Sequence, residues 1–187
     1  IKSGLDHYCR SIAKPAENIV IRNCQFKGLH GVVFGSEMSG GIRNVFIHDC
    51  ASGGYCKRAF YAKTNPDRGG FINNIQIHDC RFDEVEDLLY ITSRFAGEGE
   101  SNSFFPQIEG IHVSNVHCRK ASGAAVVLQG TEKYPLRDIY LEEIVVDSAK
   151  VGISMQNTDV VSLKNCHLGG TVTGIPTQIS TKDNIFR

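Results

Sequence analysis

The sequence predicts an all-β solenoid, a parallel β-helix of about six coils. The prediction depends on two strand patterns that recur together along the chain and on glycine-rich corners without a helical period. The first pattern alternates apolar and polar residues over four positions, as a half-buried strand does, and then reaches Asn, Asp or Glu. It begins at Asn18, Asn44, Asn74, Gly110, Asp138 and Val160. Repeats of this length that cannot bury their own apolar face stack into a solenoid.

The second strand pattern occurs once in each repeat and aligns without gaps. Its segments begin at Ile1, Phe34, Ala62, Ile91, Leu128 and Met155. Two or three short strands per turn fit a β-helix, whereas a β-propeller, the alternative, requires longer and more regular blades. We therefore expect a single β-helix domain over residues 1–187, with 171–187 as a last partial coil and tail. The stretch from Gly97 to Pro106 lengthens one repeat and is expected to form a surface loop that flanks a groove.

Stacking of the first strands predicts two inward columns of side chains, because equivalent residues on neighbouring coils lie about 4.8 Å apart. The first column contains Cys24, Cys50, Cys80, Val116, Ile144 and Cys166, and the second contains Phe26, Ser52, Phe82, Cys118, Val146 and Leu168. Five of the seven cysteines are therefore interpreted as small core residues, and their odd number argues against a full disulfide framework. Metal binding is the weaker interpretation, because no histidine faces these sulfurs. The pairing of Cys9 and Cys56 is left open.

Composition restricts the classes of ligand. Twenty basic and twenty acidic residues cancel, so no global field attracts nucleic acid or a membrane surface. The longest purely apolar run, from Ala124 to Leu128, is far too short to span a bilayer, and no leader-like segment opens the chain. No pattern predicts a cofactor or a metal. Any attraction for an acidic ligand must be local.

The second strands predict such a local feature on the outward face of the coils. One outward column contains Lys2, Gly35, Lys63, Thr92, Gln129 and Gln156, and its neighbour contains Val33, Tyr61, Tyr90, Val127 and Ser154. Lys2 and Lys63 are expected about 10 Å apart, with Gly35 between them as a floor without a side chain. Tyr61 lies beside Lys63, and His30 is expected to enter from the preceding turn. A flat groove of this kind suits an anionic polysaccharide; the alternative is that these lysines are ordinary exposed strand residues.

The order of these motifs resembles a known enzyme family. The segments that carry the resemblance are Ile1-Lys2-Ser3-Gly4, the strand Asn18 to Cys24, His30-Gly31, the stretch Gly35 to Gly41, Lys63-Thr64-Asn65 and Arg68-Gly69-Gly70. They resemble glycoside hydrolase family 28, the polygalacturonases and related pectin hydrolases, densely to about Gly70 and as the bare repeat to about Gly170. The resemblance implies a right-handed, pectin-lyase-like β-helix and inverting hydrolysis of α-1,4-galacturonan. It also implies a secreted or periplasmic protein.

The resemblance also suggests roles for individual residues. His30 falls on the family's active-site histidine, which supports the acid–base machinery, and Lys63 falls on the lysine of an Arg-x-Lys motif that grips the substrate carboxylate. Tyr61 stands where that motif has arginine, so the fork that would hold a carboxylate through two hydrogen bonds is missing. The residues expected to bind substrate are Lys63, Lys2, Tyr61, Gly35, Ser36 and Arg68.

The family's catalytic carboxylates are expected outside this chain. They come from an Asn-Thr-Asp segment and an Asp-Asp pair, which precede the strand matched by Ile1 to Gly4. Inverting hydrolysis needs two carboxyl groups about 6.5 to 9.5 Å apart. Asp6 and Glu37 on neighbouring coils are the weak alternative, because both are more simply explained as turn residues.

We therefore expect a truncated hydrolase that is inactive alone and self-associates through an uncapped N-terminal coil. The alternatives are a non-catalytic galacturonate-binding β-helix and a structural solenoid.

Overall fold

The computed structural model describes residues 1–96 and 103–173, together with the backbone of 178–182. Strands dominate this part of the chain. The elements in chain order are α1 His7–Ile12, β1 Ala16–Arg22, β2 Gln25–Phe26, β3 His30–Gly35, β4 Ile42–His48, β5 Ala51–Lys63, β6 Phe71–Thr92, β7 Gln107–Gln129, β8 Arg137–Val146, β9 Ala149–Gln156, β10 Val160–Lys164, β11 Thr171–Thr173 and β12 Gln178–Lys182.

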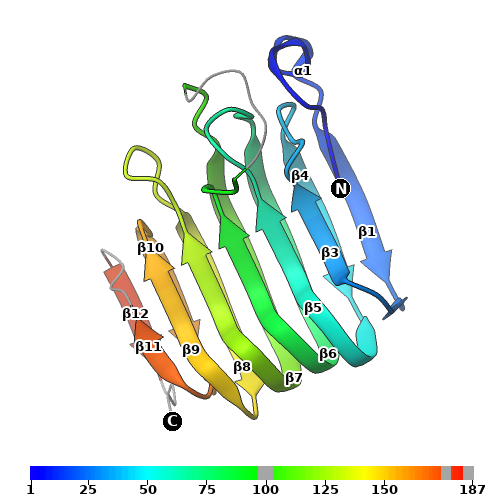
Figure 1. Cartoon of the computed structure of the whole chain (residues 1–187), viewed down its shortest axis with the longest axis vertical. Helices are drawn as coiled ribbons and strands as arrows, with labels where there is room; N and C mark the ends of the chain where they lie inside the picture. Colours follow the sequence, from blue (N-terminus) through cyan, green and yellow to red (C-terminus); the bar gives the residue numbers. More distant parts are fainter. Residues whose placement is uncertain (97–102, 174–177, 183–187) are drawn as a thin grey trace.

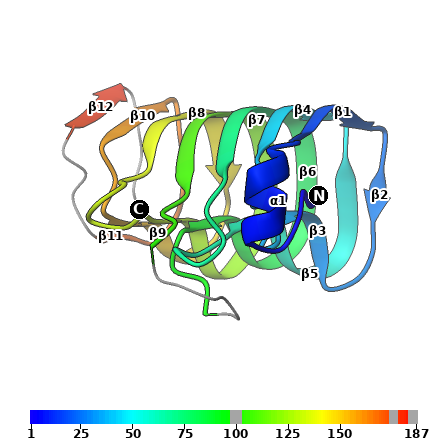
Figure 2. The same ribbon diagram turned by 90° about the horizontal axis from the view of Figure 1, so that it is seen from above.

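All strand pairs in this topology are parallel, and two rows contain every strand except β2, which pairs with the start of β5. One row runs β1-β4-β6-β7-β8-β10-β12. The other contains β3, β5, β6, β7, β9 and β11, because the long strands β5, β6 and β7 bend round the corners of the coil. The second row faces the viewer in Figure 1, and Figure 2 shows the two rows facing each other across the core. The predicted parallel β-helix is confirmed.

The strand registers confirm both inward columns. Cys80 pairs with Val116, which pairs with Ile144, and Phe82 pairs with Cys118, which pairs with Val146. The five cysteines assigned to the core face inward, and four of them are fully buried. Within the described structure no disulfide joins any of the seven cysteines. Burial raises the pKa of the Cys80 thiol to about 12 and that of Cys118 to about 11, so these sulfurs stay protonated and inert. Cys56, whose pairing with Cys9 was left open, is also buried.

A ladder of asparagines turns the chain at one corner of the coils. Asn18, Asn44 and Asn74 all adopt left-handed backbone conformations, with φ of 58°, 54° and 52°. The Asn44 amide donates to the Asn18 side-chain oxygen at 3.0 Å, and the Asn74 amide donates to that of Asn44 at 2.8 Å. Asparagine tolerates this conformation better than most residues. The left-handed corner thus explains the Asn, Gly or Asp at the start of five of the six first-pattern strands, namely Asn18, Asn44, Asn74, Gly110 and Asp138.

Replacing Asn74 with alanine is expected to lower the free energy of unfolding by about 2 kcal/mol. The left-handed conformation costs alanine about 1 kcal/mol or more, and the lost side-chain hydrogen bond costs about 1 kcal/mol. Urea denaturation with an unchanged slope would measure the effect. Asn74→Gly is the matched control, because glycine accepts the backbone and loses the hydrogen bond alone. Equal losses for the two variants would exclude a backbone contribution.

One element differs from the expectation of strands alone. Residues His7–Ile12 form the short helix α1, which begins after the cap Asp6 and ends at Ala13 in a left-handed conformation. The Asp6 side chain accepts a hydrogen bond from the Tyr8 amide at 3.2 Å, as an N-cap does. Among the described residues no helix has the length and apolarity to cross a membrane. Of the loop expected from Gly97 to Pro106, residues 97–102 lie outside the described part of the chain, and 103–106 form no strand or helix.

Candidate active-site groove

The predicted outward columns lie on the strand row that faces the viewer in Figure 1. One register chain links Gly35, Lys63, Thr92, Gln129 and Gln156, and the next links Val33, Tyr61, Tyr90, Val127 and Ser154. We call this outward strip of β3, β5, β6, β7 and β9 the groove face. Its side chains pack against one another, so that Tyr61 is only 7% exposed. The two columns are where the sequence places them.

His30 is the first residue of β3, opposite Arg58 on the next coil, and not a residue of the preceding turn as expected. Its ring centroid lies 5.5 Å from that of Tyr61. Its Nδ1 atom is buried without a hydrogen-bond partner in the described structure. Burial, and then the nearby charges of Arg58 and Lys63, lower the pKa of His30 below its ordinary value. The imidazole is therefore neutral at pH 7, with a buried nitrogen that has no partner among the described residues.

The titration of His30 tests this environment. Its pKa should lie below the ordinary 6.5, and Lys63→Ala should raise it, because a nearby positive charge is removed. NMR titration of the imidazole signals measures both values, with the exposed Lys150→Ala as a control that should change neither. The folded chain then binds this proton more weakly than the unfolded chain. His30 therefore contributes stability above pH 6.5 that is lost as the pH falls through the lowered value. A His30 midpoint at or above 6.5 would contradict the described packing.

Lys63 and Lys2 have different surroundings, although the sequence treats them alike. The Lys63 ammonium nitrogen lies 4.4 Å from the ring centroid of Phe95 and 5.4 Å from that of Tyr61. Within the described residues Lys63 makes no ion pair with a carboxylate. Burial, followed by the charges of Lys2 and Arg58, lowers the pKa of Lys63. Lys2 instead forms an ion pair with Glu37 at 2.8 Å, so of the two lysines in the predicted outward column only Lys63 lacks a carboxylate partner in the described structure.

Two residues expected to bind substrate have structural roles. Gly35 has φ of +85°, and a Cβ there would lie 2.3 Å from the Lys63 carbonyl oxygen. Close contact between neighbouring coils therefore explains this glycine, and no sugar needs to lie against it. Arg68 is only 6% exposed and donates to the Leu5 carbonyl at 2.8 Å, which places it inside the loop instead of on the groove face. Ser36 follows Gly35 and is half-buried.

Arg58 is the groove residue that sequence analysis missed. Its guanidinium carbon lies 4.6 Å from the ring centroid of Tyr61 and 4.3 Å from that of Tyr90. Its Nε donates to Asp87 at 3.0 Å, and Nη2 approaches Glu86 at 3.5 Å. A guanidinium thus covers the tyrosine that stands in place of the motif arginine.

The signal for Arg58 was hidden by a break in the alternating burial pattern of β5. Two consecutive residues, Ala59 and Phe60, are both buried, so the alternation of faces changes phase between Arg58 and Tyr61. Strict alternation would place residues three apart on opposite faces. Only the break in burial shows that these two share the groove face.

The described carboxylates on and near the groove face are already engaged. Asp87 accepts from the Ala124 amide at 3.0 Å and from Arg58, and burial raises its pKa above the ordinary range. Glu37 is paired with Lys2, which lowers the pKa of Glu37. Asp6 caps α1. In the described ranges no three His, Cys, Asp or Glu side chains gather closely enough to hold a metal ion.

Comparison with known proteins identifies the family. The model of Glycosyl hydrolases family 28 matches residues 2–167. The chain belongs to this family. The family 28 chain is similar to an exopolygalacturonase from Thermotoga maritima of known structure, with a TM-score of 0.81 and 28% identity over 94% of this chain and 38% of that one. The match also supports the right-handed form of the parallel β-helix.

Curated relatives match the family 28 chain over a similar stretch. A probable polygalacturonase of Vitis vinifera is 26% identical over 154 residues, 80% of this chain and 31% of that protein. An exopolygalacturonase of Rhizopus delemar is 23% identical over 155 residues, 75% of this chain and 40% of that protein. The chain therefore spans about a third of the length of the curated relatives that it matches.

Proposed function

We propose that this chain carries the substrate-binding part of a polygalacturonase-type active site. The complete site would hydrolyse α-1,4-galacturonan with inversion. The observation that supports the proposal best is Lys63, a cation without a carboxylate partner in the described structure, flanked by aromatic rings beside His30 and Arg58. A galacturonate carboxylate is the partner that such a site lacks. The family membership supports the same substrate class. We also propose that the protein is secreted or periplasmic.

The acid–base pair of the hydrolysis is assigned to carboxyl groups other than those described on the groove face. Inverting hydrolysis needs one protonated carboxyl and one free carboxylate on opposite sides of the bond. Glu37 and Asp87 are each held by a cation, and Asp87 is almost completely buried. His30 fits a supporting role, because a neutral imidazole can accept a proton that a neighbouring carboxyl shares.

Binding and cleavage are measured separately to test the proposal. The 187-residue chain is titrated calorimetrically with trigalacturonate, and release of reducing ends from polygalacturonate is assayed in parallel. We expect saturable binding without release of reducing ends. Release by the chain itself would contradict the assignment of the acid–base pair. Failure to bind would contradict the proposal as a whole and favour a structural solenoid. Binding that is unchanged in a His30→Ala, Lys63→Ala double variant would place the ligand elsewhere and overturn the assignment to the groove face.

A further inference from the structure

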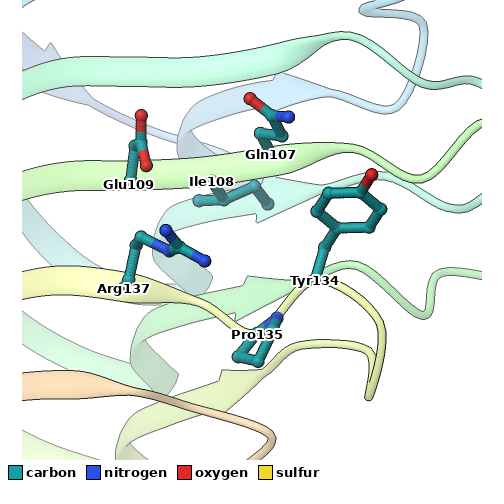
Figure 3. A pocket seen from close by; sticks show the side chains of 6 residues that line it. All are labelled: Gln107, Ile108, Glu109, Tyr134, Pro135 and Arg137. Atoms are coloured by element: carbon teal, nitrogen blue, oxygen red, sulfur yellow. The ribbon is translucent and has the colours of Figure 1, made fainter.

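Loops that follow the groove strands gather with α1 at one end of the coils (Figures 1 and 2). Two hollows adjoin there and share Tyr134. One has a volume of about 260 Å³ and is lined by Arg10, Gly69, Phe104, Phe105, Lys133 and Tyr134, among others. The other has a volume of about 140 Å³ and is lined by Gln107, Ile108, Glu109, Tyr134, Pro135 and Arg137 (Figure 3). No residue assigned above to the groove face lines either hollow, so we call the pair the loop site.

Cations stacked on aromatic rings hold the loop site together. The Arg10 guanidinium carbon lies 3.5 Å from the ring centroid of Phe104, and its Nη1 donates to the carbonyl of Asp67 at 3.0 Å. The Lys133 ammonium nitrogen lies 4.8 Å from the centroid of Phe105, whose ring lies 5.8 Å from that of Tyr134. Contacts of this kind link α1 and three separate loops. The aromatic walls are therefore fixed relative to one another before any ligand arrives.

Positive charge at the loop site exceeds negative charge. Among the described residues that line the hollows, three are cations, Arg10, Lys133 and Arg137, and one is a carboxylate, Glu109. None of the three forms an ion pair with a described carboxylate. The whole chain has a formal net charge of zero, so this surplus is local. A concave surface with unpaired cations attracts anions.

We propose that the loop site binds an acidic saccharide, separately from the groove face. Pyranose rings bind to sites that combine an apolar wall with convergent polar groups, and here Tyr134 and Pro135 supply the wall. Figure 3 shows Gln107, Glu109 and Arg137 arranged around the same space, where an amide and a carboxylate can hold sugar hydroxyls while cations take a carboxylate. Glu109 disfavours the densely charged backbone of a nucleic acid, which would meet it as a like charge. A sugar polymer with isolated carboxylates offers a carboxylate to the cations and hydroxyl groups to Glu109.

Such a site would hold a second part of the same polymer while the groove face holds the first. Two linked contacts raise the local concentration of substrate and slow its escape. The loop site does not depend on the chemistry proposed for the groove, and it can be measured after the groove is disabled.

The test uses hexagalacturonate and a chain carrying His30→Ala and Lys63→Ala. We expect residual, salt-sensitive binding that falls by about tenfold or more when Lys133→Ala and Arg137→Ala are added, because each removes an attractive charge. Both side chains are exposed, so the fold should survive, and an unchanged thermal transition would verify this. Lys120→Ala with Lys150→Ala is the matched control, since it removes the same charge from exposed positions outside the loop site.

Two further ligands distinguish the chemistry of the partner. A neutral galactan hexamer should bind more weakly than hexagalacturonate, and a thymidine hexanucleotide should bind more weakly than both. Absence of residual binding in the groove variant, an equal loss in the control pair, or binding of the oligonucleotide as tight as that of the acidic sugar would each overturn the proposal. Loss of binding in the loop variants with no effect of the groove variants would instead support the loop site and contradict the proposed groove.

Discussion

Replacing Lys63 with alanine is expected to weaken the binding of oligogalacturonate by about 10- to 100-fold. A hydrogen bond to a charged group contributes about 1.5 to 3 kcal/mol, and the Lys63 ammonium group has no carboxylate partner in the described structure. Calorimetric titration at low ionic strength measures the affinity. Lys63→Arg keeps the charge in a different shape and should lose less.

Lys2→Ala is the matched control for this measurement. Sequence reasoning gives the two lysines equal standing in one outward column, but the Lys2 ammonium group is already paired with Glu37 at 2.8 Å. An exposed, paired lysine should contribute little, so we expect less than about a threefold change in affinity. A loss for Lys2→Ala as large as that for Lys63→Ala would contradict the different roles assigned here.

Replacing Arg58 with alanine is expected to lower the free energy of unfolding by about 3 kcal/mol at pH 7. The Arg58 side chain is 15% exposed and that of its partner Asp87 is 8% exposed. Removing one member of a buried pair leaves the other charge without compensation. Urea denaturation would measure the loss. Arg119 also contacts two carboxylates, but its side chain is 53% exposed, so Arg119→Ala should cost no more than about 1 kcal/mol.

The Arg58→Ala effect should depend on pH in a defined direction. Burial raises the pKa of Asp87 in the folded chain, so the folded state holds this proton more tightly than the unfolded state does. Stability linked to Asp87 therefore falls as the pH rises from the ordinary aspartate pKa through the raised value. Loss of Arg58 raises that pKa further, which makes the destabilisation larger at pH 7 than at pH 4. Adding Asp87→Asn should recover part of the loss; an unchanged loss at both pH values would exclude the buried ion pair as its cause.

Most of the fold could be predicted from the sequence, because the β-helix repeats a pattern of period two. The alternation at Asn44 and Asn74 fixes which residues face inward, and stacking then fixes the columns that the registers confirm. The helix α1 was missed because it is only six residues long and has no buried face. Its signal was Asp6, a residue of the type that caps helices.

The candidate site could be predicted less completely, because its side chains are positioned by features without a sequence period. The two consecutive buried residues between Arg58 and Tyr61 shift the alternation, and no pattern in the sequence marks this shift. The pairing of Lys2 with Glu37 depends on where two long side chains meet across coils. Burial of Arg68 depends on how its loop folds over Leu5. Strand columns thus locate the groove face, whereas the contacts decide which of its residues can meet a ligand.

Binding of galacturonan to the groove face is the basis of the proposed function. It is tested most directly by titrating the isotopically labelled chain with trigalacturonate and following the backbone amide signals by NMR. We expect the largest shifts at low ligand ratios on β3, β5 and β6, at Gly35, Lys63 and Thr92, together with shifts of the imidazole signals of His30. Unchanged signals on β3, β5 and β6, together with shifts elsewhere, for example on the outward face of β4 and β8, would contradict binding at the groove face.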